Sequence, residues 1–225
     1  YRELPGVFDP LDGMKADAPK IHGEDNVFYH YKLRTGEPEI EKAFAECDVI
    51  VENTYRTSMV DHCFLQPEAG IAYIDENDKI TVMTATQYPH YDQEEIAEGL
   101  GVEKERIRVI TAAIGGAFGG REDITLQIHL ALAAMKLDRP VKTVYSREDS
   151  FKAHSKRHPI HMKFRTGAMK DGTLHAMEAE IVGDSGAHAS WAYSILRKAG
   201  VHATGPYHIP PVSYTHLRAH ETVLD

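Results

Sequence analysis

The segment Arg106–Lys136, RIRVITAAIGGAFGGREDITLQIHLALAAMK, decides the predicted fold of this chain. It begins with Arg106–Ile114, which alternates and then becomes apolar, a pattern typical of a strand. A glycine-rich loop follows at Gly115–Gly120, and Glu122–Lys136 carries apolar residues at the spacing of one helix face. The order of strand, glycine loop and helix predicts a domain in which a sheet packs against helices.

The backbone of this glycine loop is suited to close contact with a ligand. Glycines permit left-handed dihedral angles and lack side chains that would keep a ligand at a distance. N–H groups of such a loop, beside the start of a helix, suit anionic or oxo-bearing ligands. The spacing fits neither the dinucleotide-binding fingerprint nor the P-loop, and a purely structural turn is the alternative. Phe118 is unusual in a glycine turn, because its large ring must pack against something or cover it.

Further elements are predicted on both sides of this segment. Asp75–Asp78 is a turn between two β-rich runs, and Lys170–Gly172 is the turn of a longer hairpin. Tyr91–Leu100 has helical spacing and ends at Gly101. The other predicted elements are Glu39–Glu46 as a short helix and Val49–Arg56, Gly70–Ile74, Lys79–Thr86, Val141–Tyr145, Ile160–Met169 and Leu174–Asp184 as strands. Together they predict an α+β (mixed α/β) fold of β-hairpins and a mixed sheet with packed helices.

Composition excludes several classes of function. The 225 residues carry a net charge of −9, so the chain lacks the basic surface that nucleic-acid binding needs. No apolar run approaches the ~20 residues of a membrane-spanning helix. Two cysteines without a CxxC motif argue against a disulfide scaffold and against an iron–sulfur cluster held by this chain alone. A reducing, cytoplasmic setting is therefore expected.

Three segments of the chain differ in character. Residues 1–20 are rich in Pro, Gly and Asp, and we expect a connector from a preceding domain, with Tyr1 in place of Met indicating a truncated start. Residues 21–212 are predicted to form one folded domain. Residues 213–225, SYTHLRAHETVLD, resemble translated sequencing-adapter read-through, so we expect a non-native tail and leave it out of the functional argument.

The glycine loop and its neighbours resemble one enzyme family. Residues Gly115–Arg121, GGAFGGR, resemble the GG-x-FGG-K/R signature of molybdenum hydroxylase large subunits. Further family motifs are matched in order by Thr86–Gln87, Leu100–Val102, Ala131–Ala134, Arg139–Val141, Ser146–Asp149, Arg157–Pro159, Asp184–Ala187 and Tyr207–Pro210. One such motif alone is weak, whereas the ordered set is specific and covers about residues 1–212.

The resemblance implies the first part of the molybdopterin-binding domain of an enzyme of the xanthine dehydrogenase and aldehyde oxidase type. In this family a pterin dithiolene holds the molybdenum, so no protein ligand to the metal is expected. A cytosine dinucleotide form of the pterin is one option, and 2Fe-2S and FAD groups are expected on other domains or subunits of an oligomer. The implied chemistry is hydroxylation of a small molecule, with water as the source of oxygen.

The resemblance also implies roles for individual residues. Gln87 matches a glutamine whose amide lies beside the molybdenum ligands, where it can donate without competing as a strong ligand. Glu122 matches a substrate-contacting glutamate of purine-oxidising members; a helix-start acid that interacts with the helix dipole is the alternative. The predicted cofactor-binding residues are Gln87, Gly115, Gly116, Ala117, Phe118, Gly119, Gly120 and Arg121. Arg121 replaces the commoner lysine and keeps its positive charge.

Histidines near the end of this region suggest a metal site, but their context does not support one. His154, His158 and His161 could cluster on a helix, yet Pro159 and a predicted strand interrupt it, so solvated or hydrogen-bonded histidines are expected. His62 lies in a segment that resembles the family's H-x-x-LEP motif, with Gln66 where glutamate is usual. We expect a structural role for His62.

The favoured functional reading is a purine hydroxylase such as xanthine dehydrogenase. Aldehyde, nicotinate and carbon monoxide oxidation within the same family are alternatives, and a non-catalytic scaffold module is an alternative from another class. The family's general-base glutamate and substrate-orienting arginine belong to motifs that this chain lacks. Because general-base catalysis contributes roughly 10²–10⁴-fold, the isolated chain is predicted to be inactive.

Overall fold

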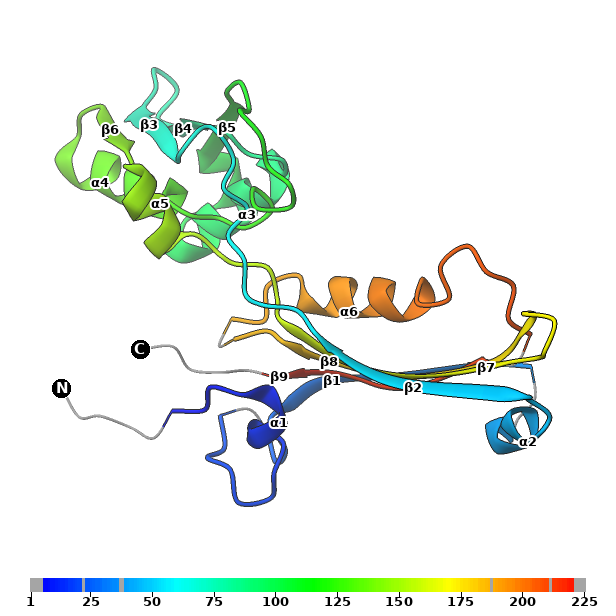
Figure 1. Ribbon diagram of the computed structural model, residues 1–225. Helices are drawn as coiled ribbons and strands as arrows, with labels where there is room; N and C mark the ends of the chain where they lie inside the picture. The colour runs from blue at the N-terminus through cyan, green and yellow to red at the C-terminus, as the bar shows by residue number, and fades with distance from the viewer. Residues whose placement is uncertain (1–5, 22, 37–38, 187, 211, 221–225) are drawn as a thin grey trace. The chain divides into compact units, whose positions relative to one another are not determined.

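The computed structural model describes residues 6–21, 23–36, 39–186 and 188–210, and the backbone of residues 212–220. The chain forms two compact units (Figure 1). The first unit consists of residues 1–59 and 158–225, and the second consists of Val60–Arg157. The second unit is therefore one continuous insertion between two parts of the first.

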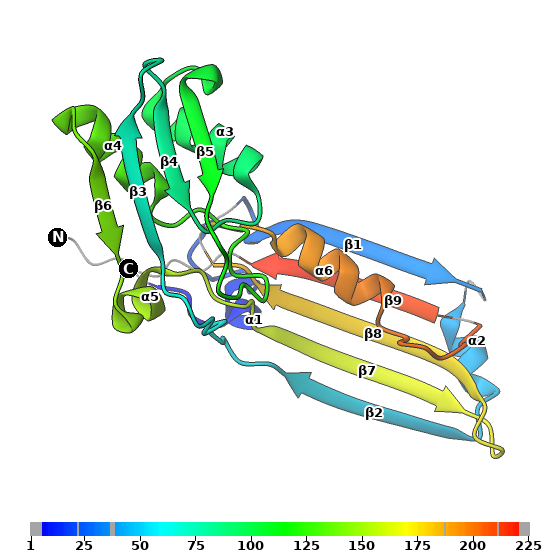
Figure 2. The same cartoon turned by 90° about the horizontal axis from the view of Figure 1, so that it is seen from above.

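The first unit is built on a five-stranded sheet in the order β1-β9-β8-β7-β2 (Figure 2). Its strands are β1 (Val27–Thr35), β2 (Val49–Arg56), β7 (Ile160–Ala168), β8 (Leu174–Asp184) and β9 (Val212–His220). Neighbouring strands are antiparallel except β8 and β9, which are parallel. The predicted hairpin is confirmed as β7 and β8, whose turn contains Gly172 at φ +89°.

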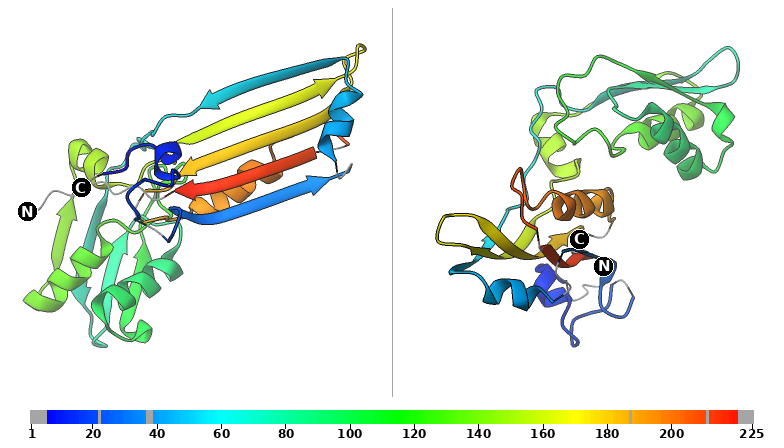
Figure 3. Two further views of the ribbon diagram at one scale, coloured as in Figure 1. Left: turned by 90° about the horizontal axis from the view of Figure 1, so that it is seen from below. Right: turned by 90° about the vertical axis from the view of Figure 1, so that its right-hand side faces the viewer.

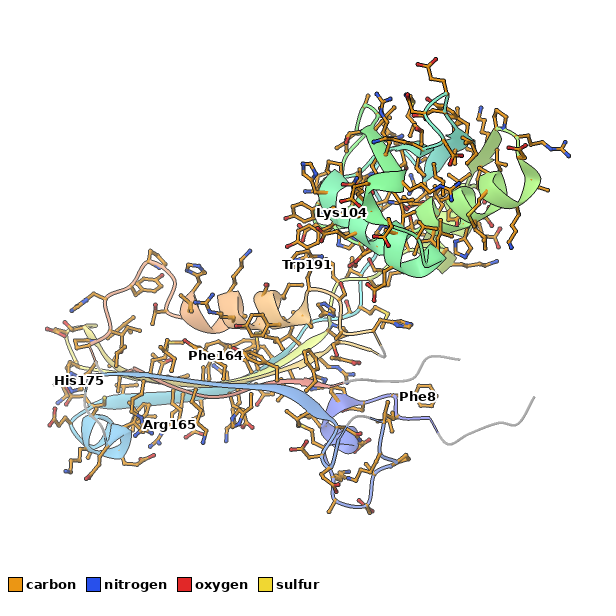
Figure 4. All side chains as sticks on the ribbon, turned by 180° about the vertical axis from the view of Figure 1, so that it is seen from behind. Phe8, Lys104, Phe164, Arg165, His175 and Trp191 are labelled. Carbon is orange, nitrogen blue, oxygen red and sulfur yellow. The ribbon has the colours of Figure 1, made fainter. Side chains whose placement is uncertain are left out.

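Helices cover both faces of this sheet: α6 (Ala192–Val201) lies on one face and α2 (Ile40–Ala45) on the other (Figure 3). Strand residues alternate between the two faces, as the labelled Phe164 and Arg165 of β7 show (Figure 4). Phe164 belongs to the apolar core under α6, where Leu196 is buried. Arg165 stacks on the Phe44 ring of α2 at 3.9 Å.

Both ends of the chain contribute backbone structure to the first unit. A short helix, α1 (Pro10–Gly13), lies within the predicted connector, and the Asp9 side chain caps it by accepting the Leu11 N–H at 2.8 Å. All of β9 except Val212 lies within the segment predicted to be a non-native tail, and its backbone pairs with β8 and β1. The domain limits at residues 20 and 213 remain predictions.

The second unit has a four-stranded sheet in the order β5-β4-β3-β6 (Figure 2). Its elements are β3 (Ala69–Ile74), β4 (Ile80–Thr84), α3 (Pro89–Leu100), η1 (Lys104–Arg106), β5 (Ile107–Thr111), α4 (Gln127–Leu137), β6 (Val141–Val144) and α5 (Arg147–Ala153). The predicted strands and α3 are confirmed, with α3 ending at Gly101 in the left-handed conformation. Ile96 of α3 and Leu130 of α4 are buried against the sheet in the core of this unit.

Some predictions of local structure were wrong or incomplete. α4 begins at Gln127 and not at Glu122, because Ile124 and Leu126 enter the core from an irregular segment before the helix. Six elements of the described chain were not predicted: α1, β1, η1, α5, α6 and β9. The fold class is nevertheless α+β, as expected. Within the described residues, no helix combines the length and the apolar character needed to cross a membrane.

Candidate functional site

The glycine loop lies in the second unit between β5 and α4, as predicted. Gly116 and Gly119 have φ values of +103° and +88°, which side chains strongly disfavour. Gly120 is buried against the rings of His62 and His154, and an added Cβ would come within 2.9 Å of both. Glycine is therefore required in this loop for backbone conformation at two positions and for close packing at a third.

The side chains of Gln66 and Arg121 hold the glycine loop in place by hydrogen bonds. The Gly115 N–H donates to Gln66 Oε1 at 2.9 Å, so the residue found in place of the usual glutamate accepts a hydrogen bond from the loop. Arg121 Nε donates to the Gly116 carbonyl at 3.1 Å, and its Nη2 donates to the Gln66 carbonyl. The Arg121 guanidinium also stacks on the Phe64 ring at 4.1 Å and is buried, so it holds the loop from its inner side.

The outer part of the loop presents backbone donors. The Gly120 N–H is bonded to the Ala117 carbonyl at 2.9 Å. Within the part of the chain that the structure describes, no hydrogen bond is recorded for the N–H groups of residues 116–119, and Phe118 and Gly119 are exposed. This donor set fits an anionic or oxo-bearing group such as the molybdopterin cofactor.

Phe118 has an unusual conformation for a large residue. Its φ is +54°, and 74% of its surface is exposed. Its ring lies next to Gly116, where an added Cβ would be 3.3 Å from Phe118 Cε2. Left-handed backbone at a non-glycine residue costs about 1–3 kcal/mol and is concentrated at ligand-binding sites, so Phe118 marks the loop as a functional candidate.

Gln87 is brought to the C-terminal end of the glycine loop. Its N–H donates to the Arg121 carbonyl at 3.1 Å. The residue itself is exposed, although Thr86 before it is buried. Within the described residues no partner is recorded for the Gln87 side-chain amide, which can therefore bind a ligand.

Glu122 follows the glycine loop directly and is half-buried. It lies in a bend five positions before the first residue of α4. The alternative that Glu122 is a helix-start acid is therefore wrong, because its carboxylate is not in the first turn, where the helix dipole acts. Contact with a substrate remains the proposed role for this residue.

A buried polar cluster under the glycine loop was not predicted from the sequence. Glu68 is 1% exposed, and His154 Nε2 lies 3.6 Å from its Oε1. The adjacent His62 is half-buried, and burial together with the nearby His154 lowers its pKa. Arg147 reaches the same region and donates to the Leu65 carbonyl at 3.0 Å. The cluster joins residues 60–68 to residues 147–154, a pairing that no local sequence pattern indicates.

The three histidines considered for a metal site lie in different units. His154 belongs to the second unit, and its Nδ1 is 2.7 Å from the Ser155 carbonyl. His158 and His161 belong to the first unit, and His158 Nδ1 is 3.1 Å from the Asp184 carbonyl. No group of three His, Cys, Asp or Glu residues that could hold a metal ion was found in the described part of the chain.

These features describe an α+β fold whose candidate ligand-binding donors lie on a glycine loop. A family model for the molybdopterin cofactor-binding domain matches residues 21–221, and the chain belongs to this family. The expected family and cofactor are thereby confirmed.

Curated relatives extend over most of the chain. The large molybdopterin subunit of nicotinate dehydrogenase from Eubacterium barkeri is 42% identical over 94% of this chain and 49% of its own length. A probable xanthine dehydrogenase subunit from Bacillus subtilis is 31% identical over 94% of this chain and 28% of its own length. The chain thus spans about half of the first relative and about a quarter of the second.

A solved structure shows the same fold. The aldehyde oxidoreductase from Desulfovibrio gigas superimposes with a TM-score of 0.92 and is 28% identical. The match covers 98% of this chain and 24% of the aldehyde oxidoreductase chain. The fold described above is therefore that of one part of a much longer enzyme.

Proposed function

We propose that this chain is part of the large subunit of a molybdenum hydroxylase that oxidises an N-heterocycle. The observation that carries the proposal is the hydrogen bond from the Gln87 backbone N–H to the Arg121 carbonyl, which joins this residue with its exposed side chain to the C-terminal end of the glycine loop. A scaffold module would have no use for these groups together. The cofactor, when bound, supplies the redox chemistry, and water supplies the oxygen.

In this proposal, the residues of this chain bind the cofactor and orient the substrate. Backbone N–H groups of residues 116–119 hold the oxo-bearing part of the cofactor, and they are fixed before it binds because Gln66 and Arg121 anchor the loop. Gln87 donates its amide to the same group, and Phe118 covers the outer side of the loop. Glu122 contacts the heterocycle. Iron–sulfur and flavin proteins or domains are the proposed redox partners, in an oligomeric enzyme.

Three substrates are tested first. Glu122 favours a purine such as xanthine, whereas the relative with 42% identity acts on nicotinate by its name. An aromatic aldehyde represents the branch of the solved relative. The general base and the other substrate contacts lie outside this chain, so the complete subunit is needed.

The test is dye-linked oxidation of xanthine, nicotinate and an aromatic aldehyde by the complete subunit with its redox partners, with and without Glu122→Ala. Turnover of one heterocycle that collapses in the variant supports the proposal and selects the substrate. Turnover of the aldehyde alone, unaffected by Glu122→Ala, assigns the chain to the aldehyde branch. A subunit that binds no molybdopterin contradicts the proposal.

A further inference from the structure

Three buried polar side chains next to Gln87 have no part in the proposed function. Thr86 and Asp92 are each 2% exposed, and Gln127 is 3% exposed. Gln127 Nε2 donates to Asp92 Oδ2 at 3.1 Å, and the Thr86 side chain interacts favourably with the ionised Asp92 carboxylate. We call these three residues the Asp92 network.

The Asp92 network determines the shape of the turn that contains Gln87. The Thr86 hydroxyl oxygen accepts the Tyr88 N–H at 3.1 Å, so this hydrogen bond spans Gln87. The Gln87 N–H itself donates to the Arg121 carbonyl. Gln87 is thus held on one side by a turn whose Thr86 side chain interacts with Asp92 and on the other by the end of the glycine loop.

The same network also fixes the segment that follows the glycine loop. Gln127 Oε1 accepts the Thr125 N–H at 2.8 Å, just before α4 begins. Asp92 lies in the first turn of α3, and its N–H donates to the Tyr88 carbonyl at 3.0 Å. One carboxylate therefore connects the Gln87 turn, the start of α3 and the start of α4.

The burial of the Asp92 carboxylate costs free energy, because the charged group loses its contact with water. Desolvation raises the pKa of Asp92, and the interactions with Gln127 and Thr86 offset that only in part. Apolar side chains of similar volume often stabilise a protein as well as or better than buried polar groups. Gln93, the next residue of α3, instead bonds the Lys104 and Ile107 carbonyls and holds the helix to the start of β5.

We propose that Asp92 is a positioning residue, which sets the place of the Gln87 amide relative to the glycine loop. The proposal rests on the function proposed above. Asp92 does not touch the ligand; it acts through Thr86 on the direction of Gln87, and through Gln127 on the distance between Gln87 and the loop.

The test uses a reciprocal exchange in the complete subunit with its redox partners. Gln127→Glu removes the amide donor to Asp92 and sets a second carboxyl group against it. The double variant Asp92→Asn with Gln127→Glu restores a donor and an acceptor in swapped positions. Thr86→Val is a milder variant, which removes only the hydroxyl, and it serves if Gln127→Glu fails to fold.

Three properties are measured: amide hydrogen exchange in residues 85–91, the Mo(V) electron paramagnetic resonance signal, and kcat and KM separately. We expect Gln127→Glu to increase exchange in residues 85–91 and to change the Mo(V) signal. We expect kcat to fall by about 10–100-fold, the scale of an ångström-size misplacement, with KM within about threefold. The double variant Asp92→Asn with Gln127→Glu should return hydrogen exchange, the Mo(V) signal and kcat toward their wild-type values.

Gln93→Leu is the matched control, because it removes two hydrogen bonds from the same helix without touching Gln87. It should lower the unfolding midpoint and leave the Mo(V) signal and kcat unchanged. The proposal is overturned if a folded Gln127→Glu or Thr86→Val subunit keeps wild-type hydrogen exchange and a wild-type Mo(V) signal. It is also overturned if the double variant Asp92→Asn with Gln127→Glu recovers none of the three properties, or if Gln93→Leu changes the Mo(V) signal equally.

The result separates this proposal from the function on which it rests. A wild-type subunit that binds molybdopterin but oxidises none of the three substrates refutes the substrate class, while exchange and the Mo(V) signal still decide the role of Asp92. A wild-type subunit without molybdopterin refutes the proposed function, and with it the role of Asp92 toward the ligand.

Discussion

The two units of this chain differ in what they bury. In the first unit, the buried polar residues among those described are Asn26 and Asp184. In the second unit they are Glu68, Thr81, Thr84, Thr86, Asp92, Arg121, Gln127, Ser150 and His154. The first unit has the apolar interior expected from alternating strands and a covering helix. The second unit keeps many hydrogen-bonding groups inside, although they are costly to desolvate.

The polar interior of the second unit coincides with the candidate site. Arg121 and Gln66 anchor the glycine loop, and the Asp92 network holds the Gln87 turn. Hydrogen bonds fix direction as well as distance, whereas apolar contacts fix only proximity. Among the described residues, the first unit is held together mainly by apolar packing, whereas the second unit buries the hydrogen-bonding groups that hold the candidate site in place.

Arg121 and Arg165 each stack on a phenylalanine, and replacing them should give the largest difference in stability between the two units. Arg121→Met should destabilise the protein by roughly 3–5 kcal/mol, because it removes buried hydrogen bonds and the favourable charge interaction between Arg121 and Glu68. Arg165→Met in the first unit should cost at most about 1 kcal/mol, since its acidic partners Glu41 and Glu52 are exposed. Urea unfolding of both variants measures the difference, and equal losses would contradict it.

Core leucines test whether the units unfold separately. Leu196 is 1% exposed on α6, and Leu196→Ala should cost about 2–5 kcal/mol. We expect faster amide hydrogen exchange in β8 and unchanged exchange in β4. Leu130→Ala on α4 should give the reverse pattern. Faster exchange throughout both units after either substitution would show that they unfold as one.

Two serines at α5 in the second unit, Ser146 and Ser150, should differ in how much they contribute to stability. Ser146 caps α5 in a capping box with Asp149, and its hydroxyl lowers the pKa of the Asp149 carboxylate. Ser146→Ala should therefore cost about 1 kcal/mol. Ser150 on the same helix has a buried hydroxyl without a recorded partner, so Ser150→Ala should be neutral or stabilising. Thermal unfolding of both variants checks this, and a larger loss for Ser150→Ala would refute it.

The smallest expected effect is a pH dependence carried by the second unit. Burial lowers the pKa of His62, so its contribution to stability is present above the ordinary histidine pKa of about 6.5 and is lost as the pH falls through the lower folded value. Lowering the pH from 7 to 5 should destabilise the wild type more than His62→Asn. Unfolding midpoints at both pH values measure this, and parallel curves would rule out His62 as the source.

Much of the second unit could be predicted because its signals are local. The Asp75–Asp78 turn, the strands on either side and the glycine loop are each specified within a few residues. The start of α4 was misplaced, since apolar residues at helical spacing also occur where an irregular segment enters the core. α6 was missed because Trp191 at its N-cap makes no side-chain cap hydrogen bond, so the usual start signal is lacking.

The interactions that organise the site could not be predicted from the sequence. Gln127 and Asp92 are 35 positions apart, and Gln66 meets Gly115 across 49 positions. Periodicity and capping rules describe neighbours along the chain, whereas these contacts depend on how β3, β4 and β5 align. The resemblance to a family supplied Gln87 and the glycine loop as candidates, but not the residues that hold them.

The insertion of the second unit has a consequence for the order of folding. β2 and β7 pair directly, with the Thr57 N–H donating to the Ile160 carbonyl at 2.9 Å, and a bridge between Val60 and Arg157 closes the inserted unit just beyond them. While that unit is unfolded, pairing β2 with β7 must overcome the closure entropy of a long loop. Once it has folded, its two ends are adjacent and most of that entropy has already been lost. We therefore expect the second unit to fold first. Pulsed hydrogen exchange should then show protection of β4 before protection of β2.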